Sequence, residues 1–159
     1  MKHLFSALLV MTLFISCTSN DTPTALVPPK TDYTVENDKE ITDYIAKNKL
    51  TAFKTDSGLY YVITEPGTGT QPTATSNVTV AYKGYYTNGK IVDQSTAAGL
   101  SFDLNKVIKG WTEGIPLFKE GGSGILLVPS HLGYGSFTNN GIPGGSVLVF
   151  DVKLIKVNK

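Results

Sequence analysis

The chain has 159 residues, of which 41% are hydrophobic, and it contains 16 glycines and 8 prolines. A chain of this length can bury one good hydrophobic core but hardly two, so we expect one folded domain with a tail. Lysine and arginine total 14 against 13 aspartate and glutamate residues, and no block of like charge runs along the sequence. Because a basic face is the usual mark of nucleic-acid binding, this balance argues against nucleic acid as a partner.

The N-terminus has the organisation of an export signal. Lys2 and His3 form the charged end, an apolar run extends from Leu4 to Ile15, and Ser16 then precedes the only cysteine, Cys17. The apolar run is too short to span a membrane as a helix. The first 16 residues are therefore predicted to be a cleaved signal peptide.

The string LFISC resembles the bacterial lipobox, in which cleavage before the cysteine frees it for diacylglyceryl transfer, although Phe14 stands where leucine is usual. Cys17 is therefore predicted to be lipidated. It would anchor the protein to a bacterial membrane in the cell envelope, on the periplasmic side or at the outer surface. The alternative is a buried structural thiol, but the residues that follow, TSNDTPT, offer no core in which to bury it.

The chain divides into four predicted parts. These are a signal peptide over 1–16, a flexible tether over 17–34, an N-terminal helical extension over 35–56 and a folded domain over 57–159. The tether is rich in Thr, Ser, Asn, Asp and Pro, and such a composition cannot offset the entropy lost on ordering.

A short amphipathic helix is predicted from Asp38 to Lys49. Asn37 followed by Glu40 resembles a capping box, which marks a helix N-terminus. Apolar residues then recur at helical spacing, namely Ile41, Tyr44 and Ile45. Their single stripe must dock on the folded domain.

Alternating apolar residues and turn signals predict a set of strands after this helix. In chain order they cover 58–64, 78–86, 91–93, 102–104, 124–129 and 146–157. We expect the first two to be adjacent and antiparallel, since only a turn-rich stretch separates them. Asn88-Gly89 predicts a tight hairpin between the second and the third.

One further short helix is predicted within GWTEGIPLFKEGG, with Trp111, Ile115 and Phe118 on one face and its end at Gly121-Gly122. Pro116 inside it is expected to kink or shorten it. The sequence has no internal repeat, no phosphate-binding glycine loop and no pair of helices at βαβ spacing. The predicted fold class is α+β, a twisted antiparallel β-sheet of about five strands wrapped over one short α-helix, with an N-terminal helical addition.

Few residues could carry acid–base, nucleophilic or metal chemistry. Beyond the export signal the only histidine is His131, which we interpret as a solvated loop residue. The carboxylates lack the spacing of metal ligands or of a catalytic dyad, no GxSxG elbow is present, and Cys17 has no histidine partner. Hydrolysis is therefore poorly supported, and we expect neither a metal nor a cofactor.

Four strings, in this order and spacing, resemble the FKBP family of peptidyl-prolyl cis-trans isomerases: VTVAYKGYYTNGKIVDQS, VIKGWTEGI, LGYG and GIPGGSVLVFDVKLI. The resemblance covers roughly Ser57 to Val157, about two thirds of the chain. It implies an enzyme that rotates X-Pro bonds in unfolded or exported proteins and so assists their folding. It also implies macrolide inhibitors as ligands.

The resemblance implies a pocket, residue by residue. The catalytic positions are Tyr82, Asp93, Trp111, Tyr134 and Phe150, and the further substrate-binding positions are Val92, Leu100, Phe102, Val107, Ile108 and Ile142. In the family, the counterpart of Trp111 forms the floor beneath the proline ring and apolar side chains form the walls. The counterpart of Tyr134 donates a hydrogen bond from its loop, and that of Asp93 makes a polar contact at the rim.

Two alternatives stay open beside the isomerase. Val92 and Leu100 stand where many members have Phe, which implies thinner aromatic walls and suggests a chaperone-like binding lipoprotein that has lost efficient turnover. The other alternative is a structural envelope lipoprotein with no site, in which Trp111 and Tyr82 are enclosed by their own chain. Taken singly, most pocket residues would be core residues in any small β-rich domain, and only their joint pattern favours a pocket.

Overall fold

The computed structural model describes residues 31–158 of the protein. The predicted signal peptide, the predicted lipidation site Cys17 and the tether up to residue 30 lie outside the described residues. No helix in the described range is both long and apolar enough to cross a membrane.

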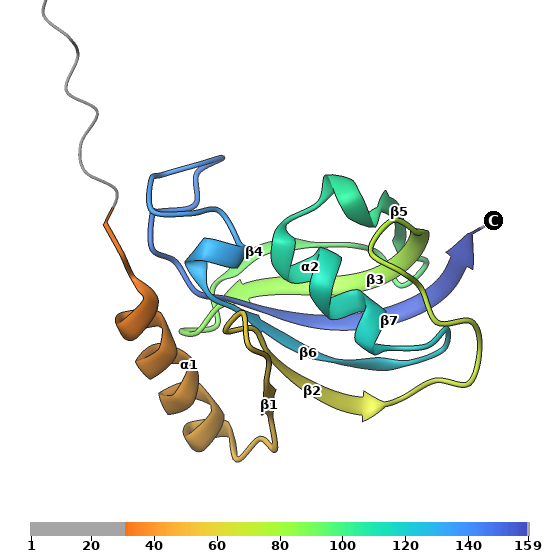
Figure 1. The fold of residues 1–159 in the computed structure, drawn as a ribbon, viewed down its shortest axis with the longest axis horizontal. Helices are drawn as coiled ribbons and strands as arrows, with labels where there is room; N and C mark the ends of the chain where they lie inside the picture. Colours follow the sequence, from red (N-terminus) through yellow and green to blue (C-terminus); the bar gives the residue numbers. More distant parts are fainter. Residues whose placement is uncertain (1–30, 159) are drawn as a thin grey trace, which may run out of the picture.

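A seven-stranded antiparallel sheet forms the centre of the fold (Figure 1). Its strands follow the spatial order β1-β2-β6-β7-β3-β4, and β5 pairs with β3 off this path. Their bounds are Phe53–Lys54 for β1, Tyr60–Glu65 for β2, Asn77–Tyr86 for β3, Ile91–Gln94 for β4, Leu100–Asp103 for β5, Ser123–Val128 for β6 and Leu148–Asn158 for β7. The count exceeds the predicted five because β3 is long enough to pair with both β4 and β5, and because β1 adds two residues at one edge.

The predicted pairing of the first two long strands is wrong, because β6 and β7 lie between β2 and β3. The turn-rich segment between them is a crossing connection and not a hairpin. It is fastened to the turn before β6, where Thr68 and Gly69 donate backbone hydrogen bonds to the Glu120 carbonyl and Glu120 donates one to Thr70. The hairpin at Asn88-Gly89 is confirmed, since the Tyr86 N–H bonds to the Lys90 carbonyl at 3.0 Å.

The helix α2 spans Lys109–Gly114 and lies across one face of the sheet (Figure 1). The 3₁₀ turn η2, Ile115–Leu117, follows directly, so the α-helix is shortened ahead of Pro116, as predicted. The predicted helix end at Gly121-Gly122 is wrong, because the backbone is already extended at Phe118. Gly110 and Gly114 lie one turn apart on the side that meets β6. A Cβ atom at Gly110 would come within 2.6 Å of the Val128 side chain, and one at Gly114 within 2.7 Å of that of Leu126.

The helix α1 spans Thr34–Asn48, so it begins four residues earlier than predicted. Asn37 is not its cap. The Asp32 carboxylate instead accepts hydrogen bonds from the backbone N–H and the hydroxyl of Thr34, at 2.9 and 2.6 Å. Asn37 lies one turn inside the helix and is only 1% exposed.

The two helices pack on opposite faces of the sheet. Neighbouring residues along a strand point to opposite faces, and Leu126 belongs to the core beneath α2 whereas Leu127 belongs to a second cluster. The predicted stripe of α1 joins that second cluster, which contains Ile41, Tyr44, Ile45, Tyr60, Leu127, Val147 and Val149. The predicted docking of this helix on the domain is confirmed.

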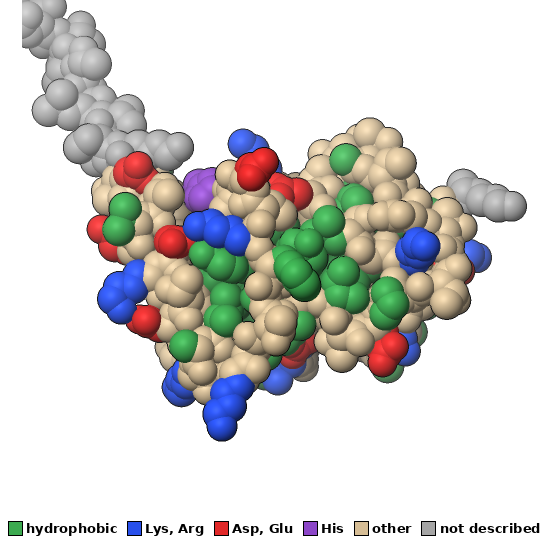
Figure 2. Space-filling view, turned by 60° about the horizontal axis from the view of Figure 1, so that its bottom comes forward, with side chains coloured by type: hydrophobic (Ala, Val, Ile, Leu, Met, Phe, Trp, Pro, Cys, Tyr) green, Lys and Arg blue, Asp and Glu red, His purple; other side chains and the backbone are tan. Residues whose placement is uncertain are grey.

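The surface of the described domain carries side chains of both charge signs. Figure 2 shows red and blue side chains interspersed around this face, with hydrophobic side chains gathered nearer its middle. Among residues 31–158, the large hydrophobic side chains that are exposed are Val35, Phe53, Ile63, Ile91, Leu100 and Phe137.

Candidate active site

A pocket of about 280 Å³ lies where α2 meets the sheet and the loop that follows β6. Its lining comes from segments far apart in the sequence: Tyr82, Asp93, Phe102, Lys106, Val107, Ile108, Trp111, Tyr134 and Phe150. The walls are mainly apolar and aromatic, and the few polar groups are concentrated among Asp93, Lys106 and the two tyrosines.

The indole of Trp111 is surrounded by aromatic rings that meet it edge to face. The ring centroid of Tyr82 lies 5.0 Å from it at 87°, that of Phe102 5.3 Å at 81°, and that of Phe150 5.5 Å at 82°. Edge-to-face pairs at these distances are favourable because the positive edge of one ring faces the negative face of the other. The indole is therefore held in one orientation by three strands and its own helix.

The Trp111 indole N–H has no hydrogen-bond partner among the described residues, although it is buried. An unpaired buried donor is rare in native interiors and costs about 1–3 kcal/mol. The aromatic packing on the other edges of the ring offsets this cost. Trp111 is thus held by the neighbouring aromatic rings and not by a hydrogen bond from its indole N–H.

Strand register places the pocket walls, and one glycine makes room for them. Gly84 on β3 is paired with Phe150 on β7. A Cβ atom at Gly84 would lie 2.6 Å from the Phe150 ring, so only glycine leaves the ring its position against Trp111. Sequence reasoning missed this supporting role, because the register of the β3–β7 pair cannot be seen in the sequence.

Tyr82 and Asp93 form the main polar contact of the pocket. The Tyr82 hydroxyl donates to one oxygen of the Asp93 carboxylate at 2.5 Å, and the other oxygen accepts the Gln94 backbone N–H at 2.8 Å. Burial, and then the hydrogen bond and charge of Asp93, raise the pKa of Tyr82 above its ordinary value. Burial followed by the charge of Asp93 also raises the pKa of Tyr134. Both phenols are therefore neutral at physiological pH.

The structure brings together eight of the eleven predicted site residues and places three elsewhere. Val92 is partly buried and packs against the main core. Leu100 is 49% exposed and lies at the start of β5, two residues before Phe102. Ile142 is 5% exposed and belongs to the core, and its backbone forms an isolated bridge with Asn139.

Lys106 lines the pocket but was not among the predicted residues. Its ammonium lies 2.8 Å from the Asp103 carboxylate, and its side chain is 75% exposed. The one feature of the sequence that could have indicated its place in the pocket is its position directly before Val107. Exposed lysines are usually plain surface residues, so composition and pattern gave no reason to select it.

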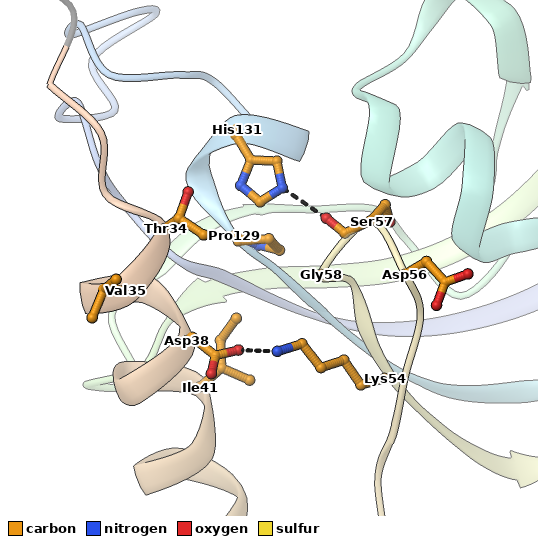
Figure 3. Close-up of a pocket in the computed structure, with 10 residues that line it drawn as sticks. All are labelled: Thr34, Val35, Asp38, Ile41, Lys54, Asp56, Ser57, Gly58, Pro129 and His131. Carbon is orange, nitrogen blue, oxygen red and sulfur yellow. Dashed lines mark hydrogen bonds and ion pairs between the residues drawn. The ribbon is translucent and has the colours of Figure 1, made fainter.

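A second cavity, of about 340 Å³, lies between α1, the turn before β2 and the loop after β6 (Figure 3). It holds the ion pair of Asp38 with Lys54 at 2.5 Å, and His131, whose Nε2 lies 2.8 Å from the Ser57 carbonyl oxygen. None of its lining residues is aromatic apart from the His131 imidazole, so it offers no ring-walled site for a proline. Residues 31–158 hold no cluster of His, Cys, Asp or Glu suited to a metal ion.

Residues 68–155 match the family described as FKBP-type peptidyl-prolyl cis-trans isomerase. The chain belongs to this family. The crystal structure of FkpA from Escherichia coli superposes with a TM-score of 0.70 at 38% sequence identity, covering 79% of this chain and 61% of that one. A peptidyl-prolyl cis-trans isomerase from Pseudomonas syringae gives a TM-score of 0.68 at 32% identity, covering 79% of this chain and 96% of that one.

Relatives of this FKBP-type chain include FkpA from Aeromonas hydrophila, which is 43% identical over 129 residues, and FkpA from Escherichia coli K12, which is 45% identical over 122 residues. These alignments cover 79% and 75% of this chain, and 48% and 44% of the relatives. The chain thus spans about half the length of the curated relatives it matches.

The pocket of this FKBP-type domain tests the alternative of a structural envelope lipoprotein that has no site. That alternative predicts that Trp111 and Tyr82 are enclosed by their own chain, whereas both line the pocket. Trp111 is 4% exposed, so it presents only a small part of its surface to the pocket. The arrangement therefore argues against a purely structural lipoprotein.

Ionisation of Tyr82 should weaken the fold at alkaline pH. Tyrosine in an unfolded chain ionises near pH 10, whereas the pKa of Tyr82 in the folded protein is raised. Above about pH 10 the folded state therefore binds more protons than the unfolded state, and stability falls as the pH rises. Replacing Tyr82 by Phe should reduce this slope by up to about 1.4 kcal/mol per pH unit. Urea unfolding at a series of alkaline pH values measures it, and equal slopes in the two proteins would contradict the prediction.

Proposed function

We propose that the protein is a peptidyl-prolyl cis-trans isomerase that rotates X-Pro bonds in proline-containing polypeptides. The observation that carries the proposal is the apolar pocket in which Tyr82, Phe102 and Phe150 surround the indole of Trp111. Membership of the FKBP-type family supports it independently. No cofactor enters the proposed mechanism.

The chemistry requires no nucleophile. The barrier to rotation, about 18–20 kcal/mol, arises from amide resonance in the planar bond. A twisted amide loses that resonance, so its carbonyl becomes less polar. An apolar pocket therefore disfavours the planar, strongly dipolar ground state more than the twisted transition state. The aromatic walls around Trp111 supply such surroundings.

Two donors in the pocket are free to hold the substrate. The Ile108 backbone N–H lies just before α2 and bonds to no other described residue, and the same is true of the Tyr134 hydroxyl. Because the pKa of Tyr134 is raised, its hydroxyl keeps its proton and can donate. These groups would bind a substrate carbonyl and fix the direction of the twist. Asp93, held by Tyr82, would make a polar contact at the rim.

The activity is tested on a proline tetrapeptide and on the refolding of a proline-limited protein, with the chain starting at Thr18. Uncatalysed rotation takes tens of seconds or more, so acceleration is readily seen. Asp93→Val and Tyr82→Phe should each lower kcat/KM by about tenfold, the factor that ~1.4 kcal/mol of lost transition-state stabilisation gives.

A second tyrosine–aspartate pair provides a matched control. Tyr85 lies on β3, as Tyr82 does, but does not line the pocket. Its hydroxyl donates to Asp151 on β7 at 3.0 Å. Tyr85→Phe should therefore leave kcat/KM unchanged. A folded protein that accelerates neither reaction would instead support the alternative of a binding or chaperone lipoprotein with the FKBP fold.

Lys106 should give the isomerase a preference for acidic residues beside the proline. Lys106 lines the pocket, and its exposed ammonium has three N–H donors, of which the ion pair with Asp103 leaves some for a substrate carboxylate. Lys106→Glu should lower kcat/KM for a tetrapeptide with Glu before proline about threefold relative to one with Lys there, and salt should abolish the effect. Lys109→Glu, nearby but outside the pocket lining, is the control. Equal ratios in both variants would refute the preference.

We also propose that the protein is a lipoprotein of the bacterial cell envelope, anchored through Cys17 and acting on exported chains. The export signal and the LFISC string before the tether support this. Macrolide inhibitors are proposed ligands of the pocket, because its apolar walls suit a bulky hydrophobic ring.

Lipidation is tested by growing bacteria that express the full chain with a radioactive fatty acid. The wild-type protein should become labelled and sediment with membranes, whereas Cys17→Ser should be unlabelled. Retention of label in Cys17→Ser would contradict the assignment of Cys17. Because the change lies outside the isomerase domain, the activity of the purified variant serves as the control.

A further inference from the structure

Asn37 and Ser130 are the two polar residues that are buried in the described part of the chain, at 1% and 4% exposure. They are bonded to each other, since the Ser130 backbone N–H donates to the Asn37 side-chain oxygen at 2.8 Å. The Asn37 side-chain amide donates in turn to the Gly145 carbonyl at 2.8 Å. One side chain on α1 therefore binds both ends of the loop between β6 and β7.

These contacts belong to a closed circuit of four hydrogen bonds. Gly135 donates its backbone N–H to the Ser130 carbonyl at 2.8 Å, and Gly145 donates its own to the Gly135 carbonyl at 2.9 Å. With the two bonds of Asn37, each of the four residues donates once and accepts once. The side chain on α1 closes a ring whose other members all lie in the loop.

Tyr134 lies between Ser130 and Gly135 in the sequence, two residues that belong to this circuit. It follows Ser130 by four residues and directly precedes Gly135, so the chain on both sides of it is held. Its ring lines the aromatic pocket. Tyr33, just before α1, adds a second restraint, because its ring lies where a Cβ atom at Gly145 would come within 2.6 Å.

The helix α1 is itself fixed to the sheet, so it can serve as a support. Asp38, one residue after Asn37, binds Lys54 of β1 at 2.5 Å and accepts the Tyr60 hydroxyl at 2.8 Å. Figure 3 shows Asp38 on α1 joined to Lys54, with Ile41 of the same helix beside it. Ile41 is fully buried in the cluster on the sheet.

We propose that Asn37 is a positioning residue for Tyr134, and that α1 is thereby a working part of the isomerase site. This inference rests on the proposed function. The match to the FKBP-type family begins at residue 68, so Asn37 lies outside the matched segment. Because Asn37 and Ser130 are buried, water cannot readily replace the bond between them, and removing the Asn37 side chain cuts both links from α1 to the loop that carries Tyr134.

The first test compares kcat and KM on a proline tetrapeptide for Asn37→Ala, Tyr134→Phe and the double variant. Asn37→Ala should lower kcat about tenfold with little change in KM, within the hundredfold that a misplacement of ~1 Å can cost. In the Tyr134→Phe background the same change should have almost no further effect. Full additivity of the two losses would overturn the proposal.

Matched variants separate positioning from stability. Asn48 lies at the other end of α1, where its side-chain amide donates to the Tyr44 carbonyl of the same helix and takes no part in the circuit. Asn48→Ala should therefore leave kcat unchanged. Ile41→Val weakens the docking of α1 without removing a bond of the circuit, and it should lower stability but not kcat. A loss of kcat in Ile41→Val equal to that in Asn37→Ala would also overturn the proposal.

Amide hydrogen exchange tests how firmly the circuit, or clamp, of Asn37, Ser130, Gly135 and Gly145 holds the loop, without an activity assay. In Asn37→Ala the exchange of the Gly135 and Gly145 N–H groups should quicken at least tenfold, while that of Val152 in β7 stays unchanged. Asn37→Asp keeps the acceptor for Ser130 but loses the donor to Gly145, so it should act chiefly on Gly145. Unchanged exchange at both glycines would refute the clamp. A protein with this exchange pattern but no isomerase activity would refute the proposed function and leave the clamp standing.

Discussion

The close contact between α2 and β6 is the constraint on which the pocket depends. Gly110 and Gly114 present no side chain to the sheet, and any Cβ there would collide with Val128 or Leu126. Only at this short distance does the indole of Trp111, on the same short helix, reach the rings of three strands. Overpacking at such contacts typically costs about 1–3 kcal/mol and shifts the backbone, so alanine at either glycine would displace the indole together with the helix.

The opposite face of the sheet supports the site from behind. Strand alternation sends Leu126 toward α2 and Leu127 toward α1, so the same strands join both helices through one layer. The loop that carries Tyr134 leaves β6 at the edge of this layer and returns to β7. Its ends therefore lie within reach of α1, and the side chain of Asn37 bridges them. The N-terminal extension is in this sense continuous with the domain, and its strand β1 pairs with β2.

Local features of the fold were predictable from the sequence, and long-range ones were not. The Asn88-Gly89 hairpin and the end of α2 before Pro116 depend on a few neighbouring residues, whose chemistry is visible in sequence. Asn37 was interpreted as part of a capping box because Glu40 follows it. Its actual partners lie 93 and 108 residues away, so no local pattern could reveal them. The predicted pairing of β2 with β3 was wrong for the same reason, since a crossing connection and a long hairpin loop have the same turn-rich composition.

The positions of Val92 and Leu100 bear on how efficient the pocket can be. Both depart from the aromatic residues that the family resemblance led us to expect, yet neither lines the pocket: one packs into the core and the other is half exposed on β5. The rings that touch Trp111 come from Tyr82, Phe102 and Phe150, and these are all present. In the proposed mechanism, these three rings and Trp111 supply the apolar surroundings of the planar amide, and Val92 and Leu100 add nothing to the lining. Turnover then depends both on these three rings and on how firmly the loop residue Tyr134 is held at the edge of the pocket.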